Sequence, residues 1–173
     1  MTVICLTGAP GAGKSTIGSL LAERGAAGVH VQVDFFRKQV RAGYASPHHW
    51  DDEVERQYHL ARRAAAATVR IYAEVGFVVV VDDIIPIEVV PAWQDLLAGL
   101  DPFFVLLAPP LEVALDRNRE RSVWTVDPAI VRSLHESLAR AADRPDWLVL
   151  DTAQLDPEAA VDLILAAAEA RSG

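Results

Sequence analysis

The chain has 173 residues, 51% of them apolar and 23% charged, a size and composition that fit one globular domain over residues 1–173 and exclude a disordered protein. Its formal net charge of −8 disfavours nucleic acid as a partner, because a long polyanion would be repelled. The single cysteine, Cys5, excludes a disulfide framework, and no apolar run has bilayer length or the pattern of a signal peptide, so we expect a cytoplasmic protein without a membrane anchor.

The first predicted strand and helix enclose the most specific motif of the chain. Val3–Leu6 is a short apolar strand, and Ser15–Glu23 has helical spacing of its apolar residues. The loop between them matches the phosphate-binding pattern G-x-x-x-x-G-K-[ST] at every fixed position. The residues that we expect to hold a nucleotide are Gly8, Ala9, Pro10, Gly11, Ala12, Gly13, Lys14, Ser15 and Thr16.

This loop has the chemistry of a phosphate cradle. Glycines let the backbone approach an anion closely, and the amides at the start of the following helix point at it. Lys14 is expected to reach the β- and γ-phosphates, and the Ser15 hydroxyl to bind Mg²⁺. We therefore predict a site for ATP and Mg²⁺.

A second strand is predicted over Val29–Val33, and it stops at Asp34. Ligands of open parallel α/β sheets bind outside the carboxyl ends of the strands, so Asp34 is a candidate base for an acceptor hydroxyl. Its alternative role is to cap the short helix expected over Phe35–Arg41. Arg37 in that helix is a candidate for binding an anionic group of the substrate or the γ-phosphate, and its alternative is an exposed surface arginine.

A group of aromatic and polar side chains follows this helix. Ala42–Trp50 is predicted to be a loop, and Asp51–Glu74 a long amphipathic helix. A ring-lined pocket with a few polar groups suits a small hydroxylated substrate, with Tyr44 and Trp50 as candidate contacts. Adjacent histidines without a third ligand at suitable spacing disfavour zinc. The group comprises Tyr44, His48, His49, Trp50, Tyr58, His59 and Arg62.

The third predicted strand, Phe77–Val81, is apolar without alternation, as expected for a central parallel strand covered on both faces. It ends in two carboxylates. Asp82 is expected beside the phosphate loop, where it would bind Mg²⁺ directly or through water. Asp83 is a candidate contact of the acceptor substrate.

The remaining elements continue the alternation of strands and helices, which predicts an α/β fold with a parallel sheet in three layers. Trp93, Trp124 and Trp147 are expected in the core or an interface. The predicted elements are a helix over Pro86–Leu100, a strand over Phe103–Leu107, a helix from Pro109 to Arg121, a loop over Ser122–Asp127, a helix over Pro128–Ala142, a strand over Trp147–Leu150 and a helix over Pro157–Ala170.

Three arginines lie close together near the end of the helix predicted from Pro109 to Arg121. Arg117 and Arg121 are four residues apart and share a helix face, whereas Arg119 lies on the other side. We predict that residues 117–127 form a lid that closes over ATP, because the planar guanidinium binds phosphate oxygens in pairs. The alternative is a solvated helix face that pairs with neighbouring carboxylates.

These motifs together resemble small P-loop kinases, in particular the chloramphenicol phosphotransferase-like and polynucleotide-kinase-like branch, with shikimate and gluconate kinases further off. The resemblance implies a five-stranded sheet of order 2-3-1-4-5 with helices on both faces, Asp34 as the base, an arginine-bearing lid, and an adenine site near residues 151–154. Residues 42–50 and 122–126 match no substrate signature. The motifs are Gly8–Thr16, Val33-Asp34-x-x-Arg37, Val81-Asp82-Asp83, Asp116–Arg121 and Leu150-Asp151-Thr152.

The favoured hypothesis is an ATP-dependent kinase that phosphorylates a hydroxyl of a small molecule. A polynucleotide or nucleoside 5′-hydroxyl kinase is compatible with the spacing of Asp34 and Arg37, but the acidic charge and the lack of a basic stripe disfavour it. A regulatory ATPase without a phosphorylated acceptor is the third alternative, and the sequence leaves the oligomeric state open. The absence of an N-K-x-D sequence disfavours guanine nucleotides.

Overall fold

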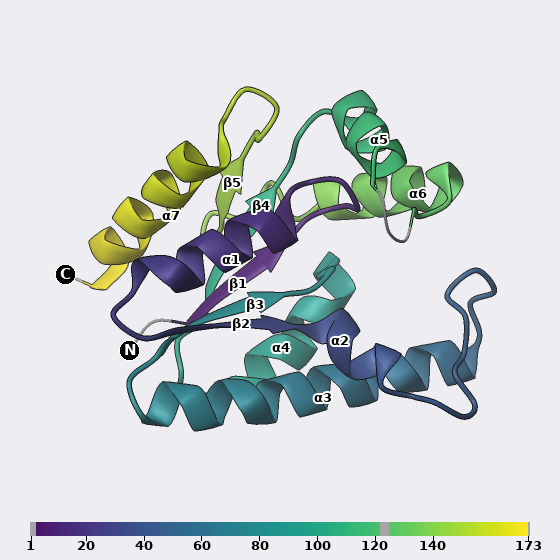
Figure 1. Ribbon diagram of the computed structural model, residues 1–173, viewed down its shortest axis with the longest axis horizontal. Helices are drawn as coiled ribbons and strands as arrows, with labels where there is room; N and C mark the ends of the chain where they lie inside the picture. The colour runs from purple at the N-terminus through teal and green to yellow at the C-terminus, as the bar shows by residue number, and fades with distance from the viewer. Residues whose placement is uncertain (1–2, 122–124, 173) are drawn as a thin grey trace.

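Five parallel strands form a single sheet in the computed structural model, which describes residues 3–121 and 125–172 (Figure 1). The order of the strands is β2-β3-β1-β4-β5, which confirms the order implied by the kinase resemblance. The strands are β1 (Val3–Thr7), β2 (Gly28–Gln32), β3 (Val78–Asp82), β4 (Phe103–Leu107) and β5 (Leu148–Leu150).

The central strands are apolar because helices cover both faces of the sheet. Every residue of β1 and β4 is buried, as are the last four residues of β3. The parallel register aligns Leu6 of β1 with Asp82 of β3. Asp82 therefore lies at the carboxyl edge of the sheet, beside the strand that leads into the phosphate loop.

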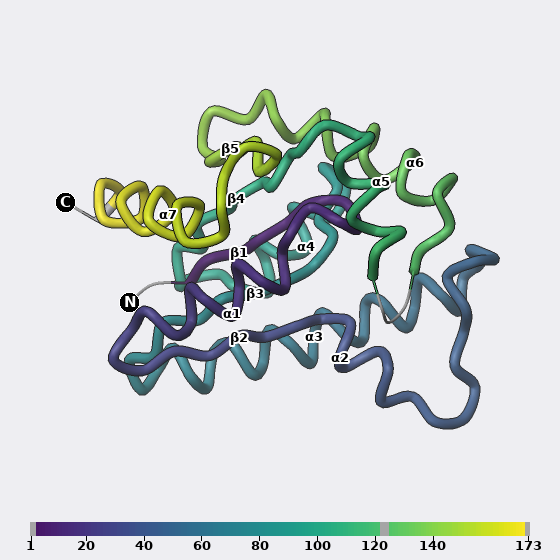
Figure 2. Tube along the Cα trace, turned by 45° about the horizontal axis from the view of Figure 1, so that its top comes forward, coloured from purple at the N-terminus to yellow at the C-terminus, as the bar shows by residue number. Residues whose placement is uncertain are grey.

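The helices divide into two layers (Figures 1 and 2). On one face, Ile17 and Leu21 of α1 pack with Ile164 of α7 against β1 and β4. On the other face, α3, α4 and the end of α6 cover the sheet, with Trp93 fully buried among them. The helices are α1 (Lys14–Arg24), α2 (Val33–Lys38), α3 (Asp52–Glu74), α4 (Val90–Leu96), α5 (Leu111–Arg119), α6 (Pro128–Ala139) and α7 (Pro157–Ser172), with a 3₁₀ turn at Ile87–Val89.

Several predicted boundaries are wrong. The helix expected over Pro86–Leu100 is a 3₁₀ turn followed by α4, which ends at Leu96. Gly99 follows in the left-handed region at φ 86°, a conformation that a continuing helix cannot contain. The fifth and sixth helices also end two and three residues earlier than expected, at Arg119 and Ala139.

The expected burial of single residues is largely confirmed. Cys5, Trp93 and Trp147 are buried, and burial raises the pKa of the Cys5 thiol well above its usual range. Trp124, also expected in the core or an interface, lies outside the described residues. Among the described helices, none is long and apolar enough to span a bilayer.

Candidate active site

The loop over residues 8–16 has the geometry of an anion cradle. Gly11 and Gly13 adopt φ values of 88° and 98°, which residues with a side chain rarely adopt. A Cβ atom on Gly11 would lie 2.1 Å from the carbonyl oxygen of Ala114 in α5, so only glycine fits there. Among the residues that the structure describes, no side chain caps the N-terminus of α1, which leaves its dipole and first amides for an anion.

Lys14 lies at the centre of this cradle. Its ammonium donates hydrogen bonds to the carbonyl oxygens of Gly8 at 2.8 Å and Ala9 at 3.4 Å. Burial lowers the pKa of Lys14, and the charge of Arg121 lowers it as well, whereas the carboxylates of Asp82 and Asp34 raise it. A partly buried ammonium bonded to neutral carbonyls fits the negative charge of nucleotide phosphates.

Ser15 and Asp82 meet at the carboxyl edge of the sheet. The Ser15 hydroxyl donates a hydrogen bond of 2.9 Å to Oδ2 of Asp82, which is buried. Burial alone would raise the pKa of Asp82, but His30, Lys14 and Ser15 favour the charged form, and the net shift is downward. A hydroxyl beside an ionised carboxylate suits Mg²⁺, which proteins commonly bind through one or two such oxygens together with phosphate oxygens.

His30 is a member of this site that the sequence did not reveal. Its Nε2 atom lies 3.6 Å from Oδ2 of Asp82 and has no hydrogen-bond partner among the described residues. The imidazole lies against α1, where a Cβ atom on Gly18 would come within 2.5 Å of Nε2. In the sequence, the only hints were a histidine within a strand and Gly18 within a helix. Their contact becomes apparent only in the folded structure.

The prediction that a strand stops at Asp34 is wrong. β2 stops at Gln32, and Asp34 lies in the first turn of α2. Val33 is buried, and the alternation that predicted a strand continues into the helix because a residue in the first helical turn can face the same core. Gln32 occupies the N-cap, so the alternative capping role of Asp34 is wrong as well. The carboxylate is 64% exposed and lies 3.7 Å from the ammonium of Lys38.

Arg37 is not an exposed surface arginine, because only 3% of its surface is accessible. Its guanidinium donates to the carbonyl oxygen of Ala45 at 2.9 Å and to the Tyr44 hydroxyl at 2.5 Å. It also lies over the rings of Tyr44 and Tyr58, 4.7 and 4.3 Å from their centroids. Such cation–π contacts stabilise a desolvated guanidinium.

Asp83 is almost fully buried beneath the aromatic cluster, by which we mean Tyr44, Trp50 and Tyr58. Its Oδ2 atom accepts hydrogen bonds from Nε of Arg62 at 2.7 Å and from Nε1 of Trp93 at 3.0 Å. Burial raises the pKa of Asp83, and the charge and hydrogen bond of Arg62 counteract part of that shift. Arg62 also lies 5.5 Å from the centroid of the Tyr58 ring, so Asp83 connects the core to the aromatic cluster.

The remaining aromatic candidates are exposed to solvent. Trp50 is 64% exposed and stacks on Tyr58, with ring centroids 5.4 Å apart, and Tyr44 is 43% exposed. In Figures 1 and 2 the connection between α2 and α3 projects from the same end of the molecule as α5. His48, His49 and His59 are exposed.

The arginines near the end of α5 interact with different groups. Arg117 donates to the carbonyl oxygen of Thr152 at 2.9 Å, and the Thr152 hydroxyl donates to the carbonyl oxygen of Ala12 in the phosphate loop at 3.1 Å. Arg119 is exposed and pairs with Asp116. Arg121 follows α5 and acts on the pKa of Lys14, as described above. Residues 122–124 of the predicted loop and lid lie outside the described residues.

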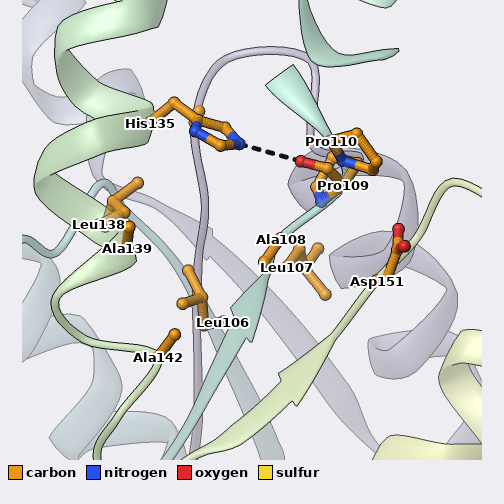
Figure 3. A pocket seen from close by; sticks show the side chains of 11 residues that line it. Leu106, Leu107, Ala108, Pro109, Pro110, His135, Leu138, Ala139, Ala142 and Asp151 are labelled. Atoms are coloured by element: carbon orange, nitrogen blue, oxygen red, sulfur yellow. Dashed lines mark hydrogen bonds between the residues drawn. The ribbon is translucent and has the colours of Figure 1, made fainter. Parts of the chain in front are cut away.

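A hollow of about 240 Å³ lies behind the loop, between β4 and α6 (Figure 3). It borders the phosphate loop at Ala9 and is lined mostly by apolar side chains. His135 of α6 contacts the carbonyl oxygen of Pro109 at 3.0 Å across its upper side. Neither Lys14 nor Asp34 lines this hollow, so the charged groups of the candidate site gather elsewhere.

A parallel sheet of this order, with a phosphate loop after its central strand, defines a P-loop nucleotide-binding protein with the fold of small-molecule kinases. A sugar kinase from Janibacter sp. HTCC2649 matches with a TM-score of 0.73 at 20% identity, over 96% of this chain and 93% of the other. Shikimate kinase from Acinetobacter baumannii in complex with shikimate gives 0.70 at 20% identity, over 99% and 94%. The tunicamycin resistance protein of Deinococcus radiodurans gives 0.67 at 20% identity, over 96% and 95%.

At 20% identity, these structural matches show that the fold is shared and no more. A comparison with family models identifies the family. The model of the chloramphenicol phosphotransferase-like proteins matches residues 1–126, and the chain belongs to that family. No curated protein sequence matches the chain significantly. Family and fold together support a phosphotransferase that uses a nucleotide.

Proposed function

We propose that the protein transfers the γ-phosphoryl group of ATP to a hydroxyl of a small molecule, in the cytoplasm and as one domain over residues 1–173. The observation that carries the proposal is the phosphate loop with its lysine and its metal-binding pair: Lys14 bonds to the carbonyl oxygens of Gly8 and Ala9, and Ser15 bonds to the buried carboxylate of Asp82. A phosphate cradle and oxygens suited to the metal thus lie together, as phosphoryl transfer requires. The charges of Asp82, Asp34 and Arg121 all act on the pKa of Lys14, which supports roles for them at the same site.

The residues divide into donor and acceptor roles. Residues 8–16 would hold the phosphates of ATP, and Ser15 and Asp82 would hold Mg²⁺, which neutralises phosphate charge when bound. Lys14, Arg117 and Arg121 would stabilise the charge of the transferred group. Arginines of the predicted lid would approach from α5, where Arg117 already contacts the loop after β5.

Asp34 would act as the base. In the proposed step the acceptor oxygen forms a bond to the γ-phosphorus, the bond from that phosphorus to the β–γ bridging oxygen breaks, and the acceptor proton passes to Asp34. Its exposure allows a substrate hydroxyl to reach it, and its effect on Lys14 supports a position facing the phosphates. The proton therefore leaves on the acceptor side, away from the departing ADP.

The aromatic cluster is the proposed acceptor site. Tyr44 and Trp50 present exposed ring surface to a small molecule, and Arg37 retains N–H groups beyond the two that bind Tyr44 and Ala45. Asp83 would support the acceptor site indirectly by positioning Arg62, because its own carboxylate is already hydrogen-bonded to Arg62 and Trp93. Rings with few polar groups favour a small hydroxylated molecule over nucleic acid.

The test is transfer of label from γ-labelled ATP, with Mg²⁺, to a panel of hydroxylated antibiotics, sugars, nucleosides and 5′-hydroxyl oligonucleotides. We expect label in a small molecule, and its loss in the absence of Mg²⁺. Label in an oligonucleotide would instead identify a polynucleotide kinase. ATP hydrolysis that no acceptor stimulates would favour a regulatory ATPase and contradict the proposal.

A further inference from the structure

The segment Gly43–Ala45, which precedes Trp50 in the acceptor site, is bound by the side chain of a buried glutamine. Gln57 of α3 is only 4% exposed. Its Oε1 atom accepts a hydrogen bond from the backbone N–H of Ala45 at 3.1 Å, and its Nε2 atom donates to the carbonyl oxygen of Gly43 at 2.7 Å. The side-chain amide thus pairs with the backbone as a neighbouring strand would.

The orientation of this amide is fixed by its partners. The Nε2 atom has two N–H groups, and the second donates to Oε1 of Glu53 at 2.7 Å. A reversed amide would place its oxygen against the Gly43 carbonyl and the Glu53 carboxylate, and its NH₂ against the Ala45 N–H. A buried amide with these partners satisfied is rigid, because breaking any one bond leaves a desolvated polar group.

Arg37 binds the same segment from α2. Its guanidinium donates to the Ala45 carbonyl oxygen and to the Tyr44 hydroxyl. Both backbone polar groups of Ala45 are therefore bonded to buried side chains that come from two different helices. Gly43 turns the chain into this position at φ 72°. The segment is held at three consecutive residues before any acceptor arrives.

This clamp sets the position of the aromatic cluster. With Gly43 and Ala45 fixed, the ring of Tyr44 lies against the guanidinium of Arg37, which also lies over the ring of Tyr58. Ordering a loop during binding costs free energy that a preformed wall avoids. A rigid segment at residues 43–45 would thus increase acceptor affinity, although Gln57, which fixes it, does not touch the acceptor.

We propose that Gln57 is a positioning residue for acceptor recognition, which fixes residues 43–45 as one wall of the acceptor site by pairing with the backbone of Gly43 and Ala45. The inference rests on the proposed function for the identity of that site. Gln57 itself contacts neither ATP nor the acceptor. Its effect is confined to acceptor binding, because its hydrogen bonds do not reach the phosphate loop.

The first arm of the test needs no substrate. Gln57→Leu keeps a similar volume and removes the three hydrogen bonds. Hydrogen exchange of the free protein should show the Ala45 amide exchanging about tenfold faster or more, while amides of β1 and α1 are unchanged. Gln94→Leu, at an exposed position of α4, is the matched control and should leave exchange at residue 45 unaltered. Unchanged exchange at Ala45 in Gln57→Leu would overturn the clamp.

The second arm uses the acceptor found by label transfer. Gln57→Leu should raise the acceptor KM by about tenfold and leave kcat and the KM for ATP within about twofold, the signature of lost uniform binding. A general structural defect would lower kcat and weaken ATP binding together, and that result would overturn the positioning role.

Gln57→Met keeps the inference testable if the leucine variant fails to fold. The unbranched methionine side chain has a length similar to that of glutamine and lacks the three hydrogen bonds, so the exchange rate of Ala45 and the acceptor KM should rise about as far as in the leucine variant. Values equal to those of the wild type would contradict the positioning role. If no compound of the label-transfer panel is phosphorylated, only the proposed function is contradicted. Hydrogen exchange tests whether Gln57 fixes residues 43–45, and it needs no acceptor.

Discussion

The nucleotide side and the acceptor side of the site are built from different kinds of contact. The phosphate loop is shaped by its own backbone: Lys14 bonds to the carbonyl of Gly8, and Gly11 lies where a Cβ atom would overlap α5. The acceptor side is shaped by side chains, in which Arg37 and Gln57 fix a loop between two helices. Backbone geometry leaves a short motif in the sequence, whereas side-chain contacts between distant segments do not.

The largest expected effect is on the nucleotide side. Lys14→Ala removes the ammonium that we propose binds the phosphates, and we expect transfer to fall by about a hundredfold to a thousandfold, the range for loss of one strong electrostatic contact to a transition state. Steady-state transfer and ATP titration measure it. Loss of less than about threefold, a factor smaller than one typical hydrogen bond supplies, would place the phosphates away from Lys14.

The largest stability effect is expected behind the acceptor site. Arg62→Ala leaves the buried carboxylate of Asp83 without its cation, which should lower the free energy of unfolding by about 3 kcal/mol in urea titrations. Arg63→Ala, at the exposed neighbouring position, is the matched control and should cost less than about 0.5 kcal/mol.

The loss caused by Arg62→Ala should depend on pH. Burial raises the pKa of Asp83, so ionising it costs stability as pH rises through its folded-state value. Arg62 offsets this cost, and the variant lacks that offset. The difference between variant and wild type should therefore be larger at about pH 8 than at about pH 5. A difference that shrinks as pH rises would mean that Asp83 is not the group exposed by the substitution.

Substituting one glycine on each side of the site, Gly11 and Gly43, should have smaller effects on stability that compare the two sides directly. Gly11 and Gly43 both have positive φ values, 88° and 72°, but only Gly11 has atoms close to its missing side chain. Gly11→Ala should cost about 3 kcal/mol of stability, from strain plus overlap with Ala114. Gly43→Ala should cost about 1 kcal/mol from strain alone. Equal losses in thermal unfolding would show that the two turns are equally crowded.

Much of the fold could be predicted because strand and helix patterns are local. The four valines before Asp82 predict a buried strand, and the alternation of elements predicts a parallel sheet. The boundaries failed where a residue faces the same core in either conformation, as Val33 does at the start of α2. The strand order followed from the kinase resemblance, since pairing between distant strands has no local signal.

The residues of the site likewise fall into those that a local sequence pattern predicts and those that only the fold brings into the site. Residues 8–16 could be predicted as a site because the phosphate loop has a fixed pattern, and Asp82 because it ends a buried strand. Gln57 and His30 were not, since a glutamine on a helix or a histidine in a strand acquires its role only from the neighbours that the fold supplies. Arg37 was predicted to bind an anionic group, but the sequence did not indicate its burial between Tyr44 and Tyr58.

The role of Asp34 as the base is the central claim, and Asp34→Asn tests it most directly because the amide keeps the shape of the carboxylate and cannot accept the proton. The measurement is the single-turnover rate of label transfer to the acceptor, together with the Kd for ATP, with Asp52→Asn in the first turn of α3 as the matched control. We predict a rate about a hundredfold to ten-thousandfold lower, with ATP affinity unchanged within about twofold. A transfer rate close to that of the wild type would contradict the assignment of the base.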